Sequence, residues 1–119
     1  MLIESHITKI IKDSSLYQLI YKLWEPKKFH KNFDIIYHKQ VPNTGIMLIN
    51  GTVTAGETEI NETCIFGLKE LLLKKEIETT IKIHSNSIAS IIDEQSLLNN
   101  FHKNPQLKKE LESLLNVNL

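Results

Sequence analysis

Between residues 29 and 92 the chain carries a series of short strand patterns separated by turn residues. Phe33, Ile35 and Tyr37 alternate with the residues between them, and residues 45–55 form an apolar run rich in strand-forming residues. Further strand patterns cover residues 59–66, 79–84 and 87–92, with turn residues at 56–57 and 85–86. Short strands at such close spacing predict a β-sandwich or a β-barrel.

Helical periodicity precedes and follows this β region. The first helical pattern ends near residues 13–15, and its apolar members are Leu2, Ile3, Ile7, Ile10 and Ile11. The second has Ser14 or Ser15 as its N-cap and Pro26 as its stop, and its members are Leu16, Leu19, Ile20 and Leu23. After Asp93, one short helix carries Leu97, Leu98 and Phe101, and another begins at Asn104-Pro105. We expect one domain, with N-terminal helices over residues 1–24, a β core over 29–92 and C-terminal helices over 94–116.

The charge balance argues against a polyanionic partner. The 119 residues carry 14 basic and 14 acidic side chains, and every basic one is a lysine. A neutral chain lacks the field that holds nucleic acid or an anionic membrane. Cys64 has no second cysteine to pair with, the N-terminal residues include charges that a signal peptide would exclude, and no uncharged stretch suits a membrane span. We expect a cytoplasmic protein that binds neither nucleic acid nor membrane.

Residues 65–72 read as a strand, a Phe-Gly turn and the start of an amphipathic helix. The first N–H groups of a helix have no partner inside the helix, and the helix dipole adds positive potential there. This segment therefore predicts a site that attracts an anion such as phosphate. A second glycine leaves two alternatives open, because Asn50-Gly51 is either a tight hairpin turn or a kink inside one long strand.

The order of these elements resembles the cyclic-nucleotide-binding domain of the catabolite activator and protein kinase A regulatory families. Residues 34–39 and 45–53 resemble that family's first strands, with Gly51 at a characteristic glycine that acts as a kink. Residues 60–67 resemble the strand before the phosphate-binding cassette, 68–73 its short helix, 81–92 the return strands and 97–115 the closing helices. The resemblance implies a mainly β fold with flanking α-helices, a double-stranded β-helix or jelly roll.

The resemblance also implies ligand chemistry from which this sequence departs. The family holds ribose with a glutamate directly after the cassette glycine, and it holds the phosphate with an arginine about ten residues further on. Here these positions are Leu68 and Glu76 or Ile77, and the glycine expected at Thr63 is absent. The cassette is therefore interpreted as degenerate.

Other residues of this chain are candidates to replace the family's ribose-binding glutamate and phosphate-binding arginine. Glu70 is an alternative ribose acceptor, and Lys74, Lys75 or Lys82 is an alternative cation; the plainer interpretation is an acidic residue near a helix start and a solvated lysine face. The candidate ligand-binding residues of the cassette are Phe66, Gly67, Leu68, Lys69, Glu70, Leu71, Glu76 and Ile77.

Other reactive residue types do not form a recognisable site. The five histidines, His6, His30, His38, His84 and His102, share no ligand-like spacing, so we expect no metal. Ser85, Ser87 and Ser90 lie near His84, but no acid is placed to orient the histidine as a hydrolase triad requires. Cys64 is expected to be a buried small hydrophobe, and Trp24 to cover the core between the N-terminal helices and the sheet.

We therefore expect a stand-alone, non-enzymatic regulatory domain without a cofactor. The chain stops at Leu119 without the helix-turn-helix module of the family's transcription factors, so protein interaction is the expected mode of action. A partner or a second copy would bind an apolar stripe on the last helix, made of Leu107, Leu111, Leu114 and Leu115; alternatively, this stripe covers the sheet. The functional alternative is a sensor of a nucleotide or another anion that uses the cassette backbone and a lysine.

Overall fold

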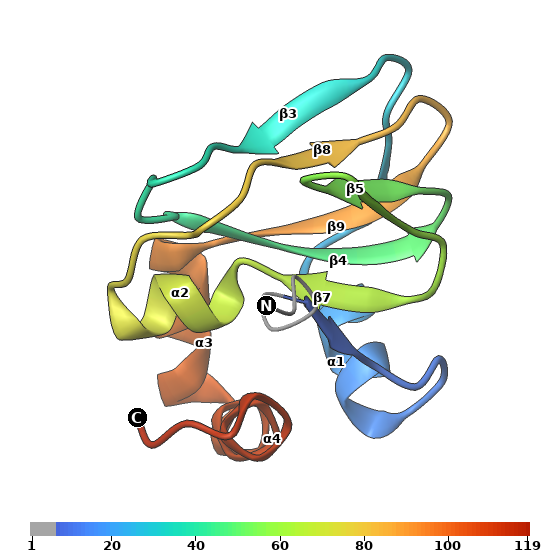
Figure 1. Ribbon diagram of the computed structural model, residues 1–119. Coiled ribbons are helices and arrows are strands. Elements are labelled where there is room, and N and C mark those ends of the chain that lie inside the picture. Colours follow the sequence, from blue (N-terminus) through green and yellow to red (C-terminus); the bar gives the residue numbers. More distant parts are fainter. Residues whose placement is uncertain (1–6) are drawn as a thin grey trace.

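Two antiparallel sheets stack face to face in the computed structural model, which describes residues 7–119 (Figure 1). The five-stranded sheet has the order β1-β7-β4-β9-β2, and the four-stranded sheet has the order β3-β8-β5-β6. The strands of the first are β1 (Ile7–Lys9), β2 (Lys27–Lys28), β4 (Thr44–Asn50), β7 (Cys64–Phe66) and β9 (Ile88–Asp93). Those of the second are β3 (Phe33–Ile36), β5 (Val53–Ala55), β6 (Thr58–Ile60) and β8 (Ile81–Ile83). This architecture with flanking helices confirms the predicted fold class.

The chain crosses from one sheet to the other at Gly51. β4 ends at Asn50 in the five-stranded sheet, and β5 begins at Val53 in the four-stranded sheet. Gly51 has a φ of 109°, and a Cβ at this residue would lie 2.6 Å from the Cα of Ser87. Only glycine enters this backbone region without strain. The hairpin interpretation of Asn50-Gly51 is therefore wrong. Gly51 bends the chain, as the kink interpretation expected, but the bend lies between two strands of different sheets and not inside one long strand.

A second crossing divides the strand predicted over residues 59–66. Its first part is β6, which pairs with β5, and its second part is β7, which pairs with β1 and β4. Residues 61–63 connect the two strands. The single long strand is therefore a wrong prediction, because the apolar pattern is continuous while the sheet to which each half belongs is decided by distant partners.

Hydrophobic side chains fill the space between the sheets. Successive residues of a strand point to opposite faces, so Ile46 and Leu48 of β4 face the four-stranded sheet while Met47 and Ile49 face away. We call the interior set the roll cluster: Ile36, Ile46, Leu48, Val53, Ala55, Cys64, Phe66, Ile77, Ile81, Ile83 and Ala89. Burial on both faces explains why β4 is apolar along most of its length.

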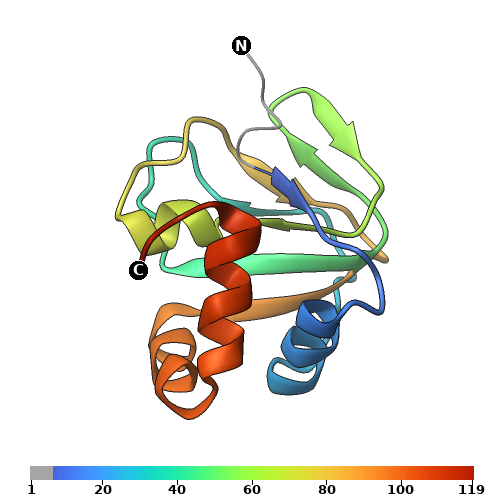
Figure 2. The ribbon, with the colours of Figure 1, turned by 90° about the horizontal axis from the view of Figure 1, so that it is seen from below.

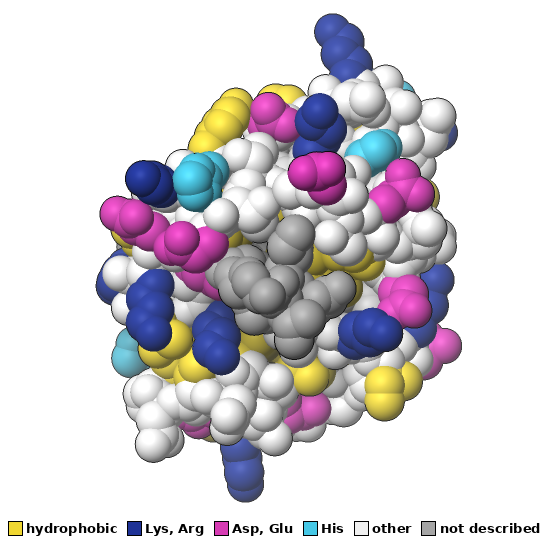
Figure 3. Space-filling view, in the orientation of Figure 1, with side chains coloured by type: hydrophobic (Ala, Val, Ile, Leu, Met, Phe, Trp, Pro, Cys, Tyr) yellow, Lys and Arg dark blue, Asp and Glu magenta, His cyan; other side chains and the backbone are white. Residues whose placement is uncertain are grey.

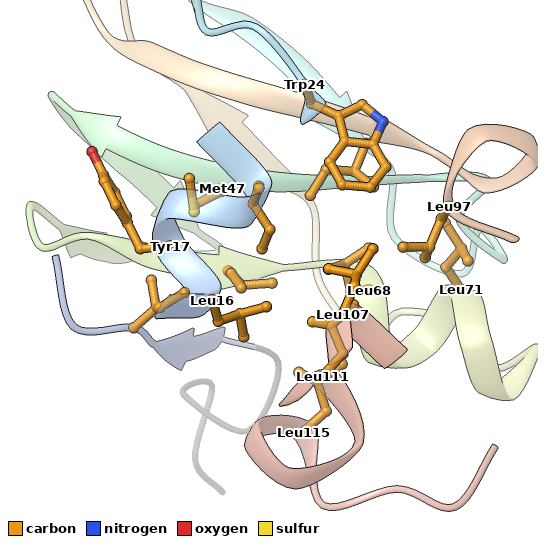
Figure 4. Packing of buried hydrophobic residues seen from close by; sticks show 14 of the residues in the cluster. Leu16, Tyr17, Trp24, Met47, Leu68, Leu71, Leu97, Leu107, Leu111 and Leu115 are labelled. Atoms are coloured by element: carbon orange, nitrogen blue, oxygen red, sulfur yellow. The ribbon is translucent and has the colours of Figure 1, made fainter. Parts of the chain in front are cut away.

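The helices cover the outer face of the five-stranded sheet (Figure 2). They are α1 (Ser15–Leu23), α2 (Leu68–Leu73), α3 (Glu94–Lys103) and α4 (Pro105–Leu115). We call the apolar set beneath them the outer cluster: Ile10, Leu16, Tyr17, Ile20, Trp24, Met47, Ile49, Ile65, Leu68, Leu71, Ile92, Leu97, Leu107, Leu111 and Leu115 (Figure 4). No helix in the part of the chain that the structure describes is long and apolar enough to cross a membrane.

The predicted helix starts and the predicted cover residue are confirmed. The Ser14 Oγ accepts a hydrogen bond from the Tyr17 N–H at 3.2 Å, so Ser14 rather than Ser15 is the N-cap of α1. α4 begins at Pro105, as Asn104-Pro105 predicted. Trp24 lies in the outer cluster, and its indole N–H donates to the Ser96 Oγ at 3.1 Å.

The apolar stripe of α4 packs inside the molecule. Leu107, Leu111 and Leu115 are buried in the outer cluster, together with Met47 and Ile65 of the five-stranded sheet (Figure 4). Leu114 is half-buried at the edge of this cluster. The interpretation in which the stripe covers the sheet is confirmed, so these leucines do not offer an exposed docking surface.

The predicted first helix is wrong where the structure describes it. Residues 7–9 form β1, which pairs with β7 so that Ile7 lies opposite Phe66, while residues 1–6, with Leu2 and Ile3, lie outside the described residues. A helix would place Ile10 and Ile11 near one face, whereas Ile10 is buried and Ile11 is 79% exposed. Pairing with the edge of β7 has overridden the helical spacing.

Candidate functional site

The Phe-Gly turn joins β7 to α2 as the sequence predicts. Phe66 ends β7, and Gly67 precedes α2 with a φ of 85° in the left-handed region. A Cβ on Gly67 would lie 2.6 Å from the Ile36 Cδ1 and 3.1 Å from the Thr44 carbonyl oxygen. Both the backbone conformation and the lack of space therefore require glycine here. α2 has only six residues and no side-chain cap at its start.

Leu68, which the resemblance places opposite a ribose-binding glutamate, packs away from the roll interior. It is fully buried and belongs to the outer cluster with Leu71, which is also fully buried (Figure 4). A Cβ on Gly45 would lie only 2.1 Å from the Leu68 Cδ2, so the leucine side chain rests directly on the backbone of β4. These two candidate residues bind α2 to the sheet and helices.

The roll interior next to the turn is apolar. Phe66 and Ile77 are 1% and 0% exposed, and both belong to the roll cluster with Ile36. Ile77 occupies the stretch in which the family places its phosphate-binding arginine. The neighbouring Glu76 is exposed to solvent. The side chain that points inward from this stretch is therefore a hydrocarbon, and the charged one points outward.

The lysines proposed as replacement cations all lie on the surface. Lys74, Lys75 and Lys82 are exposed, and the Lys74 ammonium forms an ion pair with Glu94. Lys82 stands on the outer face of the four-stranded sheet, because its strand neighbours on both sides belong to the roll cluster. Lys69 is half-buried on α2.

Glu70 is a buried acidic residue of α2. Its side chain is 7% exposed, and its backbone carbonyl accepts hydrogen bonds from the N–H groups of Lys74 and Lys75 at the end of the helix. The eight cassette candidates thus divide into a buried apolar group, a glycine turn, the buried Glu70, the half-buried Lys69 and the exposed Glu76. Their role in ligand binding stays a prediction.

The histidines and serines do not assemble into a catalytic or metal site in the described residues. His30, His38 and His102 are exposed, His84 is half-buried and bonded to the Thr54 hydroxyl, and His6 lies outside the described residues. Within residues 7–119, no group of three or more His, Cys, Asp or Glu side chains could hold a metal ion.

The serines near His84 serve the fold. The Ser87 hydroxyl is buried and links both backbone groups of Thr52, accepting from its N–H at 3.0 Å and donating to its carbonyl at 3.2 Å. Ser85 is exposed, and Ser90 is buried on β9. No arrangement of a nucleophile, a base and an acid follows from these contacts.

Cys64 is buried in the roll cluster, as predicted. Burial, with a smaller contribution from the nearby Glu62 carboxylate, raises the pKa of the Cys64 thiol to about 12. The reactive species of cysteine is the thiolate. At neutral pH the side chain is therefore an inert thiol that fills space.

The sequence did not predict the exposed aromatic residues at the two ends of β3. Phe33 and Tyr37 were assigned to a strand pattern, and both are more than half exposed. The available signal was the sequence around them, since Lys27, Lys28 and Lys31 surround Phe29 and precede Phe33. Interleaved lysine and aromatic residues are typical of binding surfaces.

Solved cyclic-nucleotide-binding domains share this fold. One similar chain comes from work on a cyclic-GMP-dependent signalling pathway that regulates bacterial phytopathogenesis; it has a TM-score of 0.70 at 8% identity, covering 93% of this chain and 99% of that chain. The catabolite activator protein of Thermus thermophilus has a TM-score of 0.66 at 15% identity, covering 87% and 54%. PKAR CBD2 with bound Sp-2Cl-cAMPS has a TM-score of 0.57 at 19% identity, covering 90% and 82%.

The fold is therefore that of a cyclic-nucleotide-binding domain, as the sequence motifs indicated. This chain spans about half the length of the Thermus thermophilus activator. No family model matches the sequence, and the search of curated proteins found no match. At identities this low, the likeness defines the fold and leaves the ligand to be inferred from the residues of this chain.

Proposed function

We propose that this chain is a non-enzymatic regulatory domain that does not bind cyclic nucleotides in the family's usual way and acts through protein interaction, in the cytoplasm. The observation that carries the proposal is the apolar filling of the roll beside the cassette. Ile36, Phe66 and Ile77 pack together there with at most 1% of each side chain exposed. A nucleotide would have to displace this cluster.

The electrostatics support the same proposal. A cyclic phosphate inside the roll is a buried anion, and an unpaired buried charge is strongly unfavourable. The chain has no arginine that could form a bidentate contact with a phosphate, and Lys74, Lys75 and Lys82 are exposed. The backbone N–H groups of α2 alone would have to hold the anion. Because α2 has only six residues, its dipole contribution is small.

Calorimetric titration with cyclic AMP, cyclic GMP and cyclic dinucleotides tests the first part. We expect no binding heat up to a ligand concentration of about 1 mM, which corresponds to a binding free energy weaker than about −4 kcal/mol. Amide NMR spectra recorded in parallel should show no shifts at Phe66 to Leu71. Micromolar binding that shifts these amides, and that Gly67→Trp abolishes in a variant with a native circular dichroism spectrum, would contradict the proposal.

A further inference from the structure

β3 is an edge strand with one open side. Within residues 7–119, β3 pairs with β8 alone, so its second edge has no strand beside it. Figure 1 shows β3 at the margin of the roll farthest from the helices. The N–H and C=O groups on such an edge can pair with an extended segment of another chain.

Large hydrophobic side chains are exposed along this edge. Phe33 at the start of β3 is 54% exposed, and Tyr37 directly after it is 57% exposed. In Figure 3, hydrophobic side chains lie along the upper margin of the molecule, over β3, with lysine, histidine and acidic side chains beside them. Apolar surface that the chain does not cover itself is typical of a protein-binding site.

A hollow lies beside the start of β3. Its volume is about 320 Å³, and its lining residues are Lys28, Phe29, His30, Lys31 and Phe33. The rings of Phe29 and Phe33 lie with centroids 6.4 Å apart at 31°. The hollow therefore combines two aromatic rings with basic side chains, which suits an apolar side chain from an acidic partner.

The charge of this segment contrasts with that of the whole chain. Residues 27–39 carry four lysines and one acid, Asp34, whereas the chain as a whole has 14 basic and 14 acidic residues. The four lysines are Lys27, Lys28, Lys31 and Lys39. The ion pairs described for residues 7–119 are Lys9–Glu62 and Lys74–Glu94, so none of the four belongs to one. Their charge is available to an acidic partner.

We propose that the open edge of β3 binds an extended acidic segment of a partner protein by strand addition, with one apolar side chain of that segment in the hollow that Phe29 and Phe33 help to line. This inference rests on the proposed function as a protein-interaction module. Lysines beside such an edge, here Lys31 before β3 and Lys39 after it, and the bulge between Asp34 and Ile36 are features that keep copies of a protein from pairing there. They oppose a second copy, which would bring like charges together, but the lysines attract an acidic segment. A peptide also matches the open backbone groups, which nucleic acid does not.

Fluorescence anisotropy with a labelled peptide of about ten residues tests the inference. The peptide alternates Glu with Val around one central Phe. A control peptide of the same charge has proline at every second position, which removes N–H donors and blocks strand addition. A labelled oligothymidylate of equal charge tests nucleic acid. The protein variants are Lys28→Glu with Lys31→Glu, and Phe33→Ser. The matched control is Lys103→Glu with Lys109→Glu, which reverses two exposed charges on α3 and α4.

We expect the alternating peptide to bind, and both β3-side variants to raise its Kd about tenfold while the control variant changes it less than about twofold. The proline peptide should not bind. Three results would overturn the inference: no binding of the alternating peptide, equal binding of the proline peptide, or tighter binding of oligothymidylate. If the peptide does not bind, the β3 edge is not the binding surface, and the proposed protein interaction would have to use another surface. Cyclic-nucleotide binding in the calorimetric experiment would instead overturn the proposed function itself, whether or not the peptide binds.

Discussion

At the residue scale, packing alone explains the glycine of the Phe-Gly turn, Gly67, and the glycine of β4 beneath α2, Gly45. Leu68 rests on the backbone at Gly45, and Ile36 fills the space beside Gly67. A side chain at either glycine would push α2 away from β4 or the Ile36 side chain out of the roll cluster. The Phe-Gly motif that suggests an anion site is thus required by close contact alone, which is why the motif persists where the expected ligand-binding side chains are absent.

Gly67→Ala should therefore destabilise the protein more than Gly56→Ala. Both glycines have a positive φ, 85° and 62°, so alanine costs about 1 kcal/mol or more at either. At Gly67 the new Cβ also meets the Ile36 Cδ1 at 2.6 Å, and overpacking adds about 1–3 kcal/mol. Urea unfolding of both variants measures the difference. Equal losses would mean that the contact with Ile36 relaxes freely and that Gly67 is required for its φ alone.

Two buried serines, Ser87 just before β9 and Ser90 on it, should respond differently to alanine. The Ser87 hydroxyl links the N–H and the carbonyl of Thr52. Ser87→Ala leaves the Thr52 N–H without this partner, while the Thr52 carbonyl keeps the hydrogen bond from the His84 N–H, and should cost about 1–3 kcal/mol. The Ser90 hydroxyl is buried and has no hydrogen-bond partner among residues 7–119, so Ser90→Ala should leave stability unchanged or raise it. Thermal unfolding by circular dichroism compares the two. A large loss in Ser90→Ala would reveal a hydrogen bond that the structure lacks.

At the element scale, the helices after residue 14 could be predicted from the sequence because their signals are local. α1 and α3 have capping side chains at Ser14 and Asp93, α4 has Pro105 in its first turn, and apolar residues recur at helical spacing. The strands were less predictable, since pairing partners are distant. β1 was read as a helix, and β6 and β7 as one strand, because no local pattern tells which sheet receives a segment.

In the candidate site, too, features set by adjacent residues could be predicted, whereas features set by contacts between distant residues could not. The turn at Gly67 followed from a few adjacent residues and was predicted correctly. The direction of Leu68, toward the helices, depends on Gly45, and the inward direction of Ile77 depends on Ile36 and the roll cluster. The exposed edge of β3 could not be read from alternation, because a strand pattern is the same whether one or both edges are paired.

The N-cap of α1 offers a test of a local signal. Ser14→Ala removes the hydrogen bond to the Tyr17 N–H and should cost about 1 kcal/mol. Ser15→Ala removes only an exposed contact with Glu110 and Gln106, and should cost less than about 0.5 kcal/mol. Chemical denaturation of the two variants decides between them. If Ser15→Ala proved the more costly, the contact between α1 and α4 would outweigh the cap.

At the scale of the whole molecule, β4 joins the roll and outer clusters into one structure. Ile46 and Leu48 contribute to the roll cluster, and Met47 and Ile49 to the outer cluster. Cys64, on the neighbouring β7, is fully buried on the roll side. We expect solvent to reach the Cys64 thiol only when the roll opens. The reactivity of the thiol therefore measures the stability of the whole fold.

The raised pKa of Cys64 gives this stability a predictable pH dependence. The folded thiol ionises near pH 12 and the unfolded thiol near its ordinary value of 9.0. Above pH 9 the unfolded chain loses this proton while the folded chain keeps it, so alkali favours unfolding until the folded thiol also ionises. Between pH 8 and pH 10, the free energy of unfolding of the natural protein should fall by about 1.4 kcal/mol more than that of Cys64→Ala.

Urea unfolding of both proteins at the two pH values measures this difference. The cavity left by Cys64→Ala lowers stability equally at each pH and cancels in the comparison, and ionisation of the lysines and tyrosines is shared by the two proteins. Thiol-reactive dye should in parallel label the natural protein at a rate that follows the fraction unfolded, rising with urea below the transition. An equal fall in stability for both proteins, together with rapid labelling in the absence of urea, would mean that the folded roll admits solvent to Cys64. The apolar filling on which the proposed function rests would then be incomplete.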